Sequence, residues 1–335
     1  MIFALMAVLH CATASDSDSS TGSTSSSSTT TTTTTSTVAT TSATISTATA
    51  TLDATSGCIT NVNTSIGTDL PSWATGNFKC QVAYTSGSNY VFKSANLPNH
   101  QSFYYCTSHG AGSTTCSTGQ NPTLWAALPG ANYAAGTNVI ASQSLVYTIP
   151  ATPTLKSGTL TSSQGGLVSI GVTTNGLAIF NNAAAPRDNL STEANTFDAY
   201  AGHPQNSGVY HHHAAVTKLS ATMADSTLIG VALDGYLIYA EYCDSGTVDT
   251  GDDFKPAANA NTATGSSTTL TGGTSTQLDE LHGHTTTTRH LTTATYHYHY
   301  AQDPTATIKT LMGSYFRGTI GSVSKLPRVE SREAA

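Results

Sequence analysis

The chain has 335 residues, of which 9% are charged, and 12 Lys and Arg against 19 Asp and Glu give a formal net charge of −7. A surface that binds nucleic acid needs a basic footprint, which this composition does not supply. The longest purely apolar run, residues 2–9, is far shorter than the ~20 residues that cross a bilayer as a helix. We therefore expect neither a nucleic-acid partner nor a membrane-spanning helix.

Residues 1–14, MIFALMAVLHCATA, predict a signal peptide. The segment is apolar and ends in Ala12-Thr13-Ala14, the small-x-small pattern that precedes signal cleavage, although it has no basic start. Lipoprotein processing at Cys11 is the weaker alternative, because the bulky His10 precedes it where a small residue is favoured. We expect an exported, extracellular protein.

Residues 15–56 predict a disordered, mucin-like linker, since Ser or Thr occupies 30 of these 42 positions. Such a segment lacks the apolar surface needed to offset the entropy of ordering. In an exported protein it reads as an extended tether, with or without O-glycosylation. Asn63-Thr-Ser and Asn189-Leu-Ser would be N-glycosylation acceptors in a eukaryotic glycoprotein.

The cysteines that follow the predicted signal peptide favour disulfides, because export leads to an oxidising compartment. The shortest loops are closed by pairing Cys58 with Cys80 and Cys106 with Cys116, which leaves Cys243 over. Four of these thiols allow three connectivities, so the other pairings stay open.

The body of the chain, residues 57–322, predicts one large all-β domain of the sandwich or barrel type, followed by a C-terminal tail at 323–335. Short segments rich in Val, Ile, Thr and Tyr are separated by Gly, Pro, Asn and Ser every 8–12 residues, and no long stretch has the apolar period of a helix. Residues 169–180 and 228–239 each predict a β-hairpin, around Asn175-Gly176 and Asp234-Gly235. Both turns favour the two-residue type I′ form.

The two hairpins are the start of an internal duplication. Each is followed by an Asp four residues before Gly-His, and then by a Tyr-His-x-His segment. These elements are Asp198 with Gly202-His203 and Tyr210–His213 in the first copy, and Asp279 with Gly283-His284 and Tyr296–His299 in the second. A pseudo-twofold arrangement would follow, and we expect the two histidine pairs to face each other.

The histidines are the candidate metal ligands. Side chains at i and i+2 of a strand share a face, so His211 with His213, and His297 with His299, would each present two imidazoles. Neutral imidazole suits zinc and copper. His203 and His284 are the next candidates, and Asp198, Asp279 and Glu280 are candidates either for hydrogen-bond acceptors that fix the imidazole tautomers or for ligands themselves. His290 has no counterpart in the first copy and is interpreted as an ordinary loop residue.

Two readings without metal remain open. Histidines on strands are often hydrogen-bonded core or surface groups, and His and Tyr together can form a polar cleft for a sugar or another polar ligand.

An enzyme is a further alternative, because His and Asp can act as acid and base or hold a catalytic metal. The sequence has no G-x-S-x-G, H-E-x-x-H or cysteine nucleophile motif.

With these residues in view, the chain resembles the YHYH domain family. Tyr296-His297-Tyr298-His299 is similar to the segment for which that family is named, and further matches follow in family order between residues 90 and 318. They are Leu97–Ser102, Ile149-Pro150, Asn175-Gly176, Gly202–Pro204, Gly230–Ala232, Leu278–Glu280 and Phe316–Gly318. The resemblance implies a secreted protein but no established activity. His212 replaces the family's second Tyr in the first copy, so it should point away from His211 and His213, into a Tyr-like pocket or to solvent.

The sequence as a whole predicts an extracellular binding protein whose paired histidines hold copper or zinc. The first alternative is a metal-dependent hydrolase or oxidase. The second is a cell-surface or matrix protein with structural histidines, and a polysaccharide or a matrix component is then a possible partner.

Overall fold

The computed structural model describes residues 45–106, 116, 121, 123–127, 138–164, 169–184, 190–213, 227–240, 266, 270, 273, 278–302 and 309–325. Over these residues the fold is all-β, as predicted, and its core cluster takes side chains from two sheets, such as Phe92 and Tyr147 from one and Val172 and Val231 from the other. Among the described residues, no helix has the length and apolar character needed to span a bilayer. The signal-peptide segment, most of the linker, Cys243 and Asn189 lie outside the described residues.

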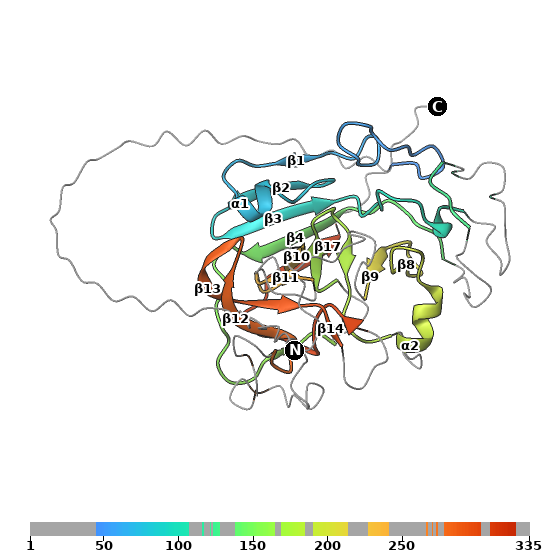
Figure 1. Ribbon diagram of the computed structural model, residues 1–335. Coiled ribbons are helices and arrows are strands. Elements are labelled where there is room, and N and C mark those ends of the chain that lie inside the picture. Colours follow the sequence, from blue (N-terminus) through green and yellow to red (C-terminus); the bar gives the residue numbers. More distant parts are fainter. Residues whose placement is uncertain are drawn as a thin grey trace, which may run out of the picture.

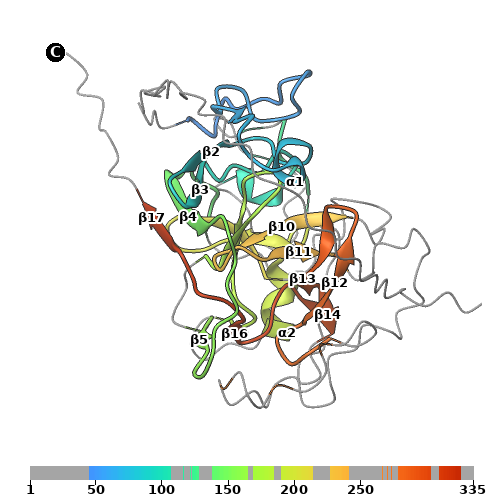
Figure 2. The same cartoon turned by 90° about the vertical axis from the view of Figure 1, so that its left-hand side faces the viewer.

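The first sheet has five strands in the order β1-β2-β3-β4-β17 (Figure 1). Their bounds are β1 (Ser65–Ile66), β2 (Val82–Ser86), β3 (Asn89–Ser94), β4 (Leu145–Pro150) and β17 (Ser322–Lys325). Figure 2 shows β17, close to the C-terminus, beside β4 at the edge of this sheet, where the two strands pair antiparallel. The folded part therefore runs past the predicted boundary at 322, and at the other end Ala50 is buried in a core cluster ahead of residue 57.

The second sheet has eight strands in the order β12-β13-β11-β10-β6-β7-β9-β8. Their bounds are β6 (Gly171–Thr173), β7 (Ala178–Ile179), β8 (Gly202–Pro204), β9 (Tyr210–His212), β10 (Leu228–Ala232), β11 (Leu237–Tyr239), β12 (Gly283–Thr288) and β13 (Leu291–His299). The order is a palindrome of the two sequence copies, β6 to β9 and β10 to β13. The sequence repeat is therefore a structural duplication about a pseudo-twofold axis between β6 and β10.

The axis passes through the pair Val172 and Val231, which lie opposite each other in the antiparallel β6–β10 pairing. The packing at this axis explains why both copies have glycine in the repeated Ile-Gly-Val. A Cβ on Gly171 would lie 2.6 Å from the Val231 carbonyl oxygen, and a Cβ on Gly230 would meet the Val172 carbonyl in the same way. Glycine at both positions allows the two copies to approach closely.

Both predicted hairpins are present, but the predicted turn type is wrong. Gly176 and Gly235 have positive φ, at 80° and 87°, whereas Asn175 and Asp234 do not. Gly176 N–H donates to Thr173 O, and the same pattern recurs in the second copy. These are three-residue loops, in which a tight turn is followed by a left-handed glycine. Asn-Gly favours type I′ only when both residues adopt positive φ.

The remaining elements are short. They are α1 (Ser72–Thr75), η1 (Phe103–Tyr105), α2 (Leu190–Glu193), η2 (Ala194–Thr196), and the strand pairs β14 (Ala301–Gln302) with β15 (Lys309–Thr310) and β5 (Thr161–Ser162) with β16 (Tyr315–Phe316). The segment of α2 and η2 comes directly before β8.

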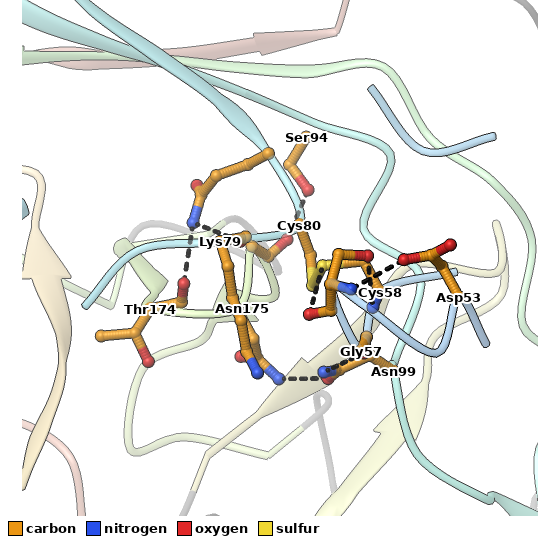
Figure 3. Close-up of a disulfide and its surroundings, with 12 residues drawn as sticks. Asp53, Gly57, Cys58, Lys79, Cys80, Ser94, Asn99, Thr174 and Asn175 are labelled. Carbon is orange, nitrogen blue, oxygen red and sulfur yellow. Dashed lines mark hydrogen bonds between the residues drawn. A yellow bond between two sulfur atoms is a disulfide. The ribbon is translucent and has the colours of Figure 1, made fainter. Parts of the chain in front are cut away.

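Two disulfides tie the N-terminal part of the fold, Cys58–Cys80 and Cys106–Cys116, and both pairings agree with the shortest-loop prediction. Figure 3 shows the first of them beside the turn of the first hairpin. Lys79 N–H donates to Thr174 O at 2.8 Å, and the Asn175 amide donates to Asn99 Oδ1 at 2.8 Å. The disulfide therefore fixes the N-terminal segment against one end of the duplicated sheet.

Candidate metal centres

The six candidate histidines form two separate triads, one in each copy. Site 1 consists of His203, His211 and His213, and site 2 consists of His284, His297 and His299. Within each site the three ligand nitrogens lie within 4.8 Å of one another, and every residue is buried. Each triad is thus arranged so that it can hold a metal ion.

The predicted face-to-face arrangement of the two histidine pairs is wrong. In the sheet order, β9 and β13 are separated by β7, β6, β10 and β11, and Figure 1 shows β8–β9 and β12–β13 at the two ends of the sheet. With strands ~4.8 Å apart, five steps place the two sites roughly 24 Å from each other. The pseudo-twofold axis relates the sites, but its position in the middle of the sheet keeps them apart.

The third histidine of each site comes from the neighbouring strand. In the β8–β9 register His203 lies opposite His211, and in the β12–β13 register His284 lies opposite His297. The two histidines of each His-x-His share one face of their strand, as the alternation predicted. The Gly-His element thus supplies the third imidazole of each group by cross-strand pairing rather than by proximity in the sequence.

The tyrosines of the same strands point to the opposite face of the sheet. In each copy the first tyrosine of the segment is hydrogen-bonded to an aspartate, Asp198 or Asp279. The Tyr210 hydroxyl donates to the carboxylate of Asp198 at 2.9 Å, and the Tyr296 hydroxyl to that of Asp279 at 3.0 Å. Each tyrosine ring passes so close over the glycine of Gly-His that a Cβ there would collide with it. The D-x-x-x-G-H and Y-H-x-H elements are therefore two halves of one packing unit.

This finding corrects the role predicted for Asp198 and Asp279. Their described hydrogen bonds go to tyrosine hydroxyls, to Ser102 and to backbone N–H groups, not to imidazoles. Burial raises the pKa of Asp198, and raises that of Asp279 to about 6. Glu280 is buried beside Asp279 and is not a member of the site 2 group.

Backbone carbonyls and one hydroxyl orient the imidazoles instead. In site 1, His211 Nδ1 lies 3.0 Å from Val209 O, and His213 Nδ1 lies 2.7 Å from Asn181 O. His203 Nδ1 lies 2.7 Å from Thr196 Oγ1, whose own proton goes to Glu193 O. Since a carbonyl only accepts, and this hydroxyl proton is already donated, all three Nδ1 atoms carry the imidazole proton.

Site 2 follows the same rule at two of its histidines. His297 Nδ1 lies 2.9 Å from Thr295 O, and His299 Nδ1 lies 2.6 Å from Ala240 O. These positions match Val209 and Asn181 of the first copy. Such contacts fix the tautomer in which Nε2 is unprotonated and has a lone pair available to a metal ion.

The Nε2 atoms converge inside each site. His211 Nε2 lies 3.0 Å from His213 Nε2, and His284 Nε2 lies 3.1 and 3.2 Å from the Nε2 atoms of His297 and His299. Two nitrogens bound to one tetrahedral zinc at 2.0–2.1 Å are about 3.3 Å apart, so the observed spacings are close to those of a metal site.

Burial keeps these imidazoles neutral. It is the largest cause that lowers the pKa of His203 and His297 to about 3 and that of His213 to about 4, and it depresses the pKa of His211 and His299 well below the usual range. Neighbouring imidazoles add to the shift in His203, His211, His297 and His299. The three imidazoles of site 1 therefore stay neutral and keep their protons on Nδ1. No proton lies between their facing Nε2 lone pairs, so the repulsion between these lone pairs is not relieved.

One residue close to site 1 was missed by the sequence reasoning. The Glu193 carboxylate, at the end of α2, has Oε1 3.6 Å from His203 Nε2 and Oε2 3.9 Å from His213 Nε2. No motif marks it, because it belongs to the segment between the hairpin and the Asp198 element. Its proximity to the site is visible only in the folded chain.

The other histidines lie outside the two groups. His212 is fully buried rather than turned to solvent, with its Nδ1 3.1 Å from Ala201 O and its ring edge-on to Tyr210. His282 is buried, has a positive φ of 67° like its counterpart Ala201, and is not part of the site 2 group. His290 lies in the β12–β13 turn, where its Nδ1 is 3.1 Å from the Tyr239 hydroxyl.

Fold and sites together define a class of β-sheet protein with a duplicated three-histidine cluster. The family model described as YHYH protein matches residues 146–313, a range that contains all six histidines, and the chain belongs to this family. Neither the curated proteins nor the solved structures include a match to the chain.

Proposed function

We propose that this protein is an exported metal-binding protein that holds one transition-metal ion, copper or zinc, in each of the two triads. One observation carries the proposal: in site 1, three buried neutral imidazoles have their protons fixed outward and their Nε2 lone pairs turned toward one another. Buried lone pairs without a donor or a cation between them are costly. A bound cation removes this cost, and imidazole nitrogen suits copper and zinc.

Export is supported by the predicted signal peptide and by the two disulfides, which are typical of oxidising compartments. In this proposal the mature chain consists of the Ser/Thr-rich tether and the β domain, and the tether separates the domain from a cell surface or matrix. Asn63 is exposed, as an N-glycosylation acceptor must be. A polysaccharide or a matrix component is the second kind of partner that we propose.

A metal-dependent hydrolase or oxidase is the second candidate function. Catalytic zinc sites combine three protein ligands with a water or substrate, and three imidazoles converge at site 2. A measured turnover that depends on His284, His297 and His299 but not on site 1 would support the enzyme.

The test is elemental analysis of the whole exported chain, purified without a His-tag or chelator. We expect two equivalents of copper or zinc per chain. His211→Ala with His213→Ala should remove one equivalent, and His297→Ala with His299→Ala should remove the other. His290→Ala is the matched control, because this half-buried histidine lies outside both triads, and it should retain both ions.

If the folded wild-type protein retains no metal even after copper and zinc are added back, the proposal is wrong. The histidines would then be structural, which is the third reading of the sequence. A circular dichroism spectrum of the β type, measured on each variant, separates loss of metal from loss of fold.

A further inference from the structure

We propose that the Glu193 carboxylate is the fourth ligand of site 1, which makes this site a closed set of three imidazoles and one carboxylate that selects a divalent ion over Cu(I). This inference rests on the proposed function, because it assigns the metal preference of one of the two sites. It begins from the position of the carboxylate, whose two oxygens lie near two different Nε2 atoms, at 3.6 and 3.9 Å.

These contacts are not hydrogen bonds. Both distances exceed the 2.7–3.2 Å of an N–H···O bond, and the tautomers assigned to His203 and His213 carry the proton on Nδ1. The carboxylate thus faces the lone-pair side of two imidazoles. Ligand atoms around a tetrahedral zinc are about 3.3 Å apart. Glu193 lies outside the group of ligand atoms that are all within 4.8 Å of one another, so at least one of its distances to the three nitrogens must shorten by roughly 1.5 Å for coordination, a movement within reach of a carboxylate rotamer change.

A built network places Glu193 at the site. Thr196 Oγ1 donates to the Glu193 carbonyl at 2.7 Å and accepts from His203 Nδ1 at 2.7 Å, so one hydroxyl joins the backbone of the carboxylate to the imidazole. The Tyr104 hydroxyl, from the core cluster, donates to Thr196 O. The Glu193 side chain is only 15% exposed. The carboxylate is therefore held over the triad by the segment of α2 and η2 and is not a freely moving surface group.

Charge and ligand hardness give the selectivity. In a buried site of low polarity, one carboxylate cancels half of the charge of a divalent ion, which lowers the cost of burying it. Carboxylate oxygen is a hard ligand that suits divalent ions, whereas Cu(I) is favoured by soft ligands. Four protein ligands are also typical of structural zinc sites. Site 1 should therefore retain a divalent ion tightly and gain little for Cu(I).

The experiment compares Zn(II) and Cu(I) affinities in proteins that keep one site only. In the site 1 protein, His297→Ala with His299→Ala, we expect Glu193→Gln to weaken Zn(II) binding at least about tenfold, since even outer partners of a metal cost 10–100-fold when lost. Cu(I) affinity should change by less than about threefold. In the site 2 protein, His211→Ala with His213→Ala, the same substitution should leave both affinities unchanged.

The outcomes separate the two proposals. Zinc binding that is absent from all these proteins and from the wild type overturns the proposed function itself. Zinc bound at site 1 with the same affinity in the Glu193→Gln protein overturns only the fourth ligand, and an equal loss for Cu(I) overturns the selectivity. If the single-site variants do not fold, a crystal structure of the zinc-loaded wild type decides, with a Glu193 oxygen 2.0–2.2 Å from the ion expected. A carboxylate outside coordination distance in that crystal rejects the assignment.

Discussion

Sites 1 and 2 have the same backbone frame and different surroundings. In both, a Gly-His strand pairs antiparallel with a Tyr-His-x-His strand, and an aspartate holds the first tyrosine. The differences arise where the copies diverge in sequence. Glu193 approaches site 1 from the segment of α2 and η2, whereas most of the corresponding part of the second copy, residues 241–277, lies outside the described residues. The comparison teaches that the duplicated motif places three imidazoles in each copy, whereas residues outside the motif, such as Glu193, differ among the described neighbours of the two sites.

The aromatic residue next to each site differs as well. Phe180 stacks on His211 with ring centroids 3.9 Å apart and an angle of 17°, whereas Tyr239 meets His297 edge-on at 5.3 Å and 78°. The Tyr239 hydroxyl contacts Thr288 Oγ1 at 2.8 Å and His290 Nδ1 at 3.1 Å. Site 2 is therefore linked through Tyr239 to the β12–β13 turn, and site 1 has a purely apolar ring in that place.

Removal of the metal ions should have the largest effect. A ligand at 1,000 times its Kd stabilises a fold by about 4 kcal/mol per site, so loss of both ions should cost about 8 kcal/mol and lower the Tm by about 15–30 °C. If Glu193 is a ligand, a chelator titration should empty site 2 before site 1. Thermal melts paired with metal analysis at each chelator concentration test this. An unchanged Tm after complete removal would break the comparison at its base.

Acid should destabilise the metal-free first copy more than the second. Burial lowers the pKa of His100 and of His212, both outside the triads, to about 4. When the pKa of a histidine in the folded state lies below its unfolded value of 6.5, the free energy of unfolding of the protein falls as the pH drops from about 6.5 to 4. Each such histidine lowers it by up to about 3 kcal/mol. A carboxyl whose pKa is raised by burial has the opposite sign and adds stability as the pH falls below that pKa. Among the described residues, the first copy has one such group, Asp198, and the second has two, Asp234 and Asp279, whose pKa values are raised to about 6.

Hydrogen exchange of the chelated protein at pH 7 and pH 5, corrected for intrinsic exchange, measures this asymmetry. Peptides from 202–213 should lose more protection at pH 5 than those from 283–299. The metal-loaded protein is the control: bound ions block protonation of the triads in both copies, so a difference that comes from His100 and His212 should persist in it. Earlier opening of 283–299 would contradict the prediction.

Much of the frame was predictable from local sequence. The strict alternation of Tyr210–His213 and Tyr296–His299 defines two faces, and the repeated order of motifs indicates a duplication. The strand order was not predictable, because which strands pair is decided by packing between distant segments. That is why the histidine pairs were expected to face each other, although four strands separate them. Glu193 and the backbone carbonyls that orient the imidazoles have no sequence signature at all.

Removing the tyrosine hydroxyl of a tyrosine–aspartate pair should reduce stability by an intermediate amount, and by different amounts in the two copies. Tyr296→Phe leaves the Asp279 carboxyl with backbone N–H donors from Leu281 and Gly283 alone among its described partners. Loss of a buried partner costs about 1–3 kcal/mol. Tyr210→Phe should cost less, because Asp198 also accepts from Ser102 Oγ at 2.5 Å. Urea denaturation of the two metal-loaded variants gives the order, and a larger loss for Tyr210→Phe would reverse it.

The smallest expected effect comes from giving site 2 the aromatic residue of site 1. Tyr239→Phe removes a hydroxyl that contacts Thr288 and His290, and one such hydrogen bond is worth about 0.5–1.5 kcal/mol. Thr288 Oγ1 still accepts from the N–H groups of His290 and Leu291, so the turn should persist. Stability should therefore fall by about 1 kcal/mol while both metal equivalents remain. Loss of the site 2 ion in this variant would mean that the Tyr239 ring position, and not the imidazole geometry alone, holds the second centre together.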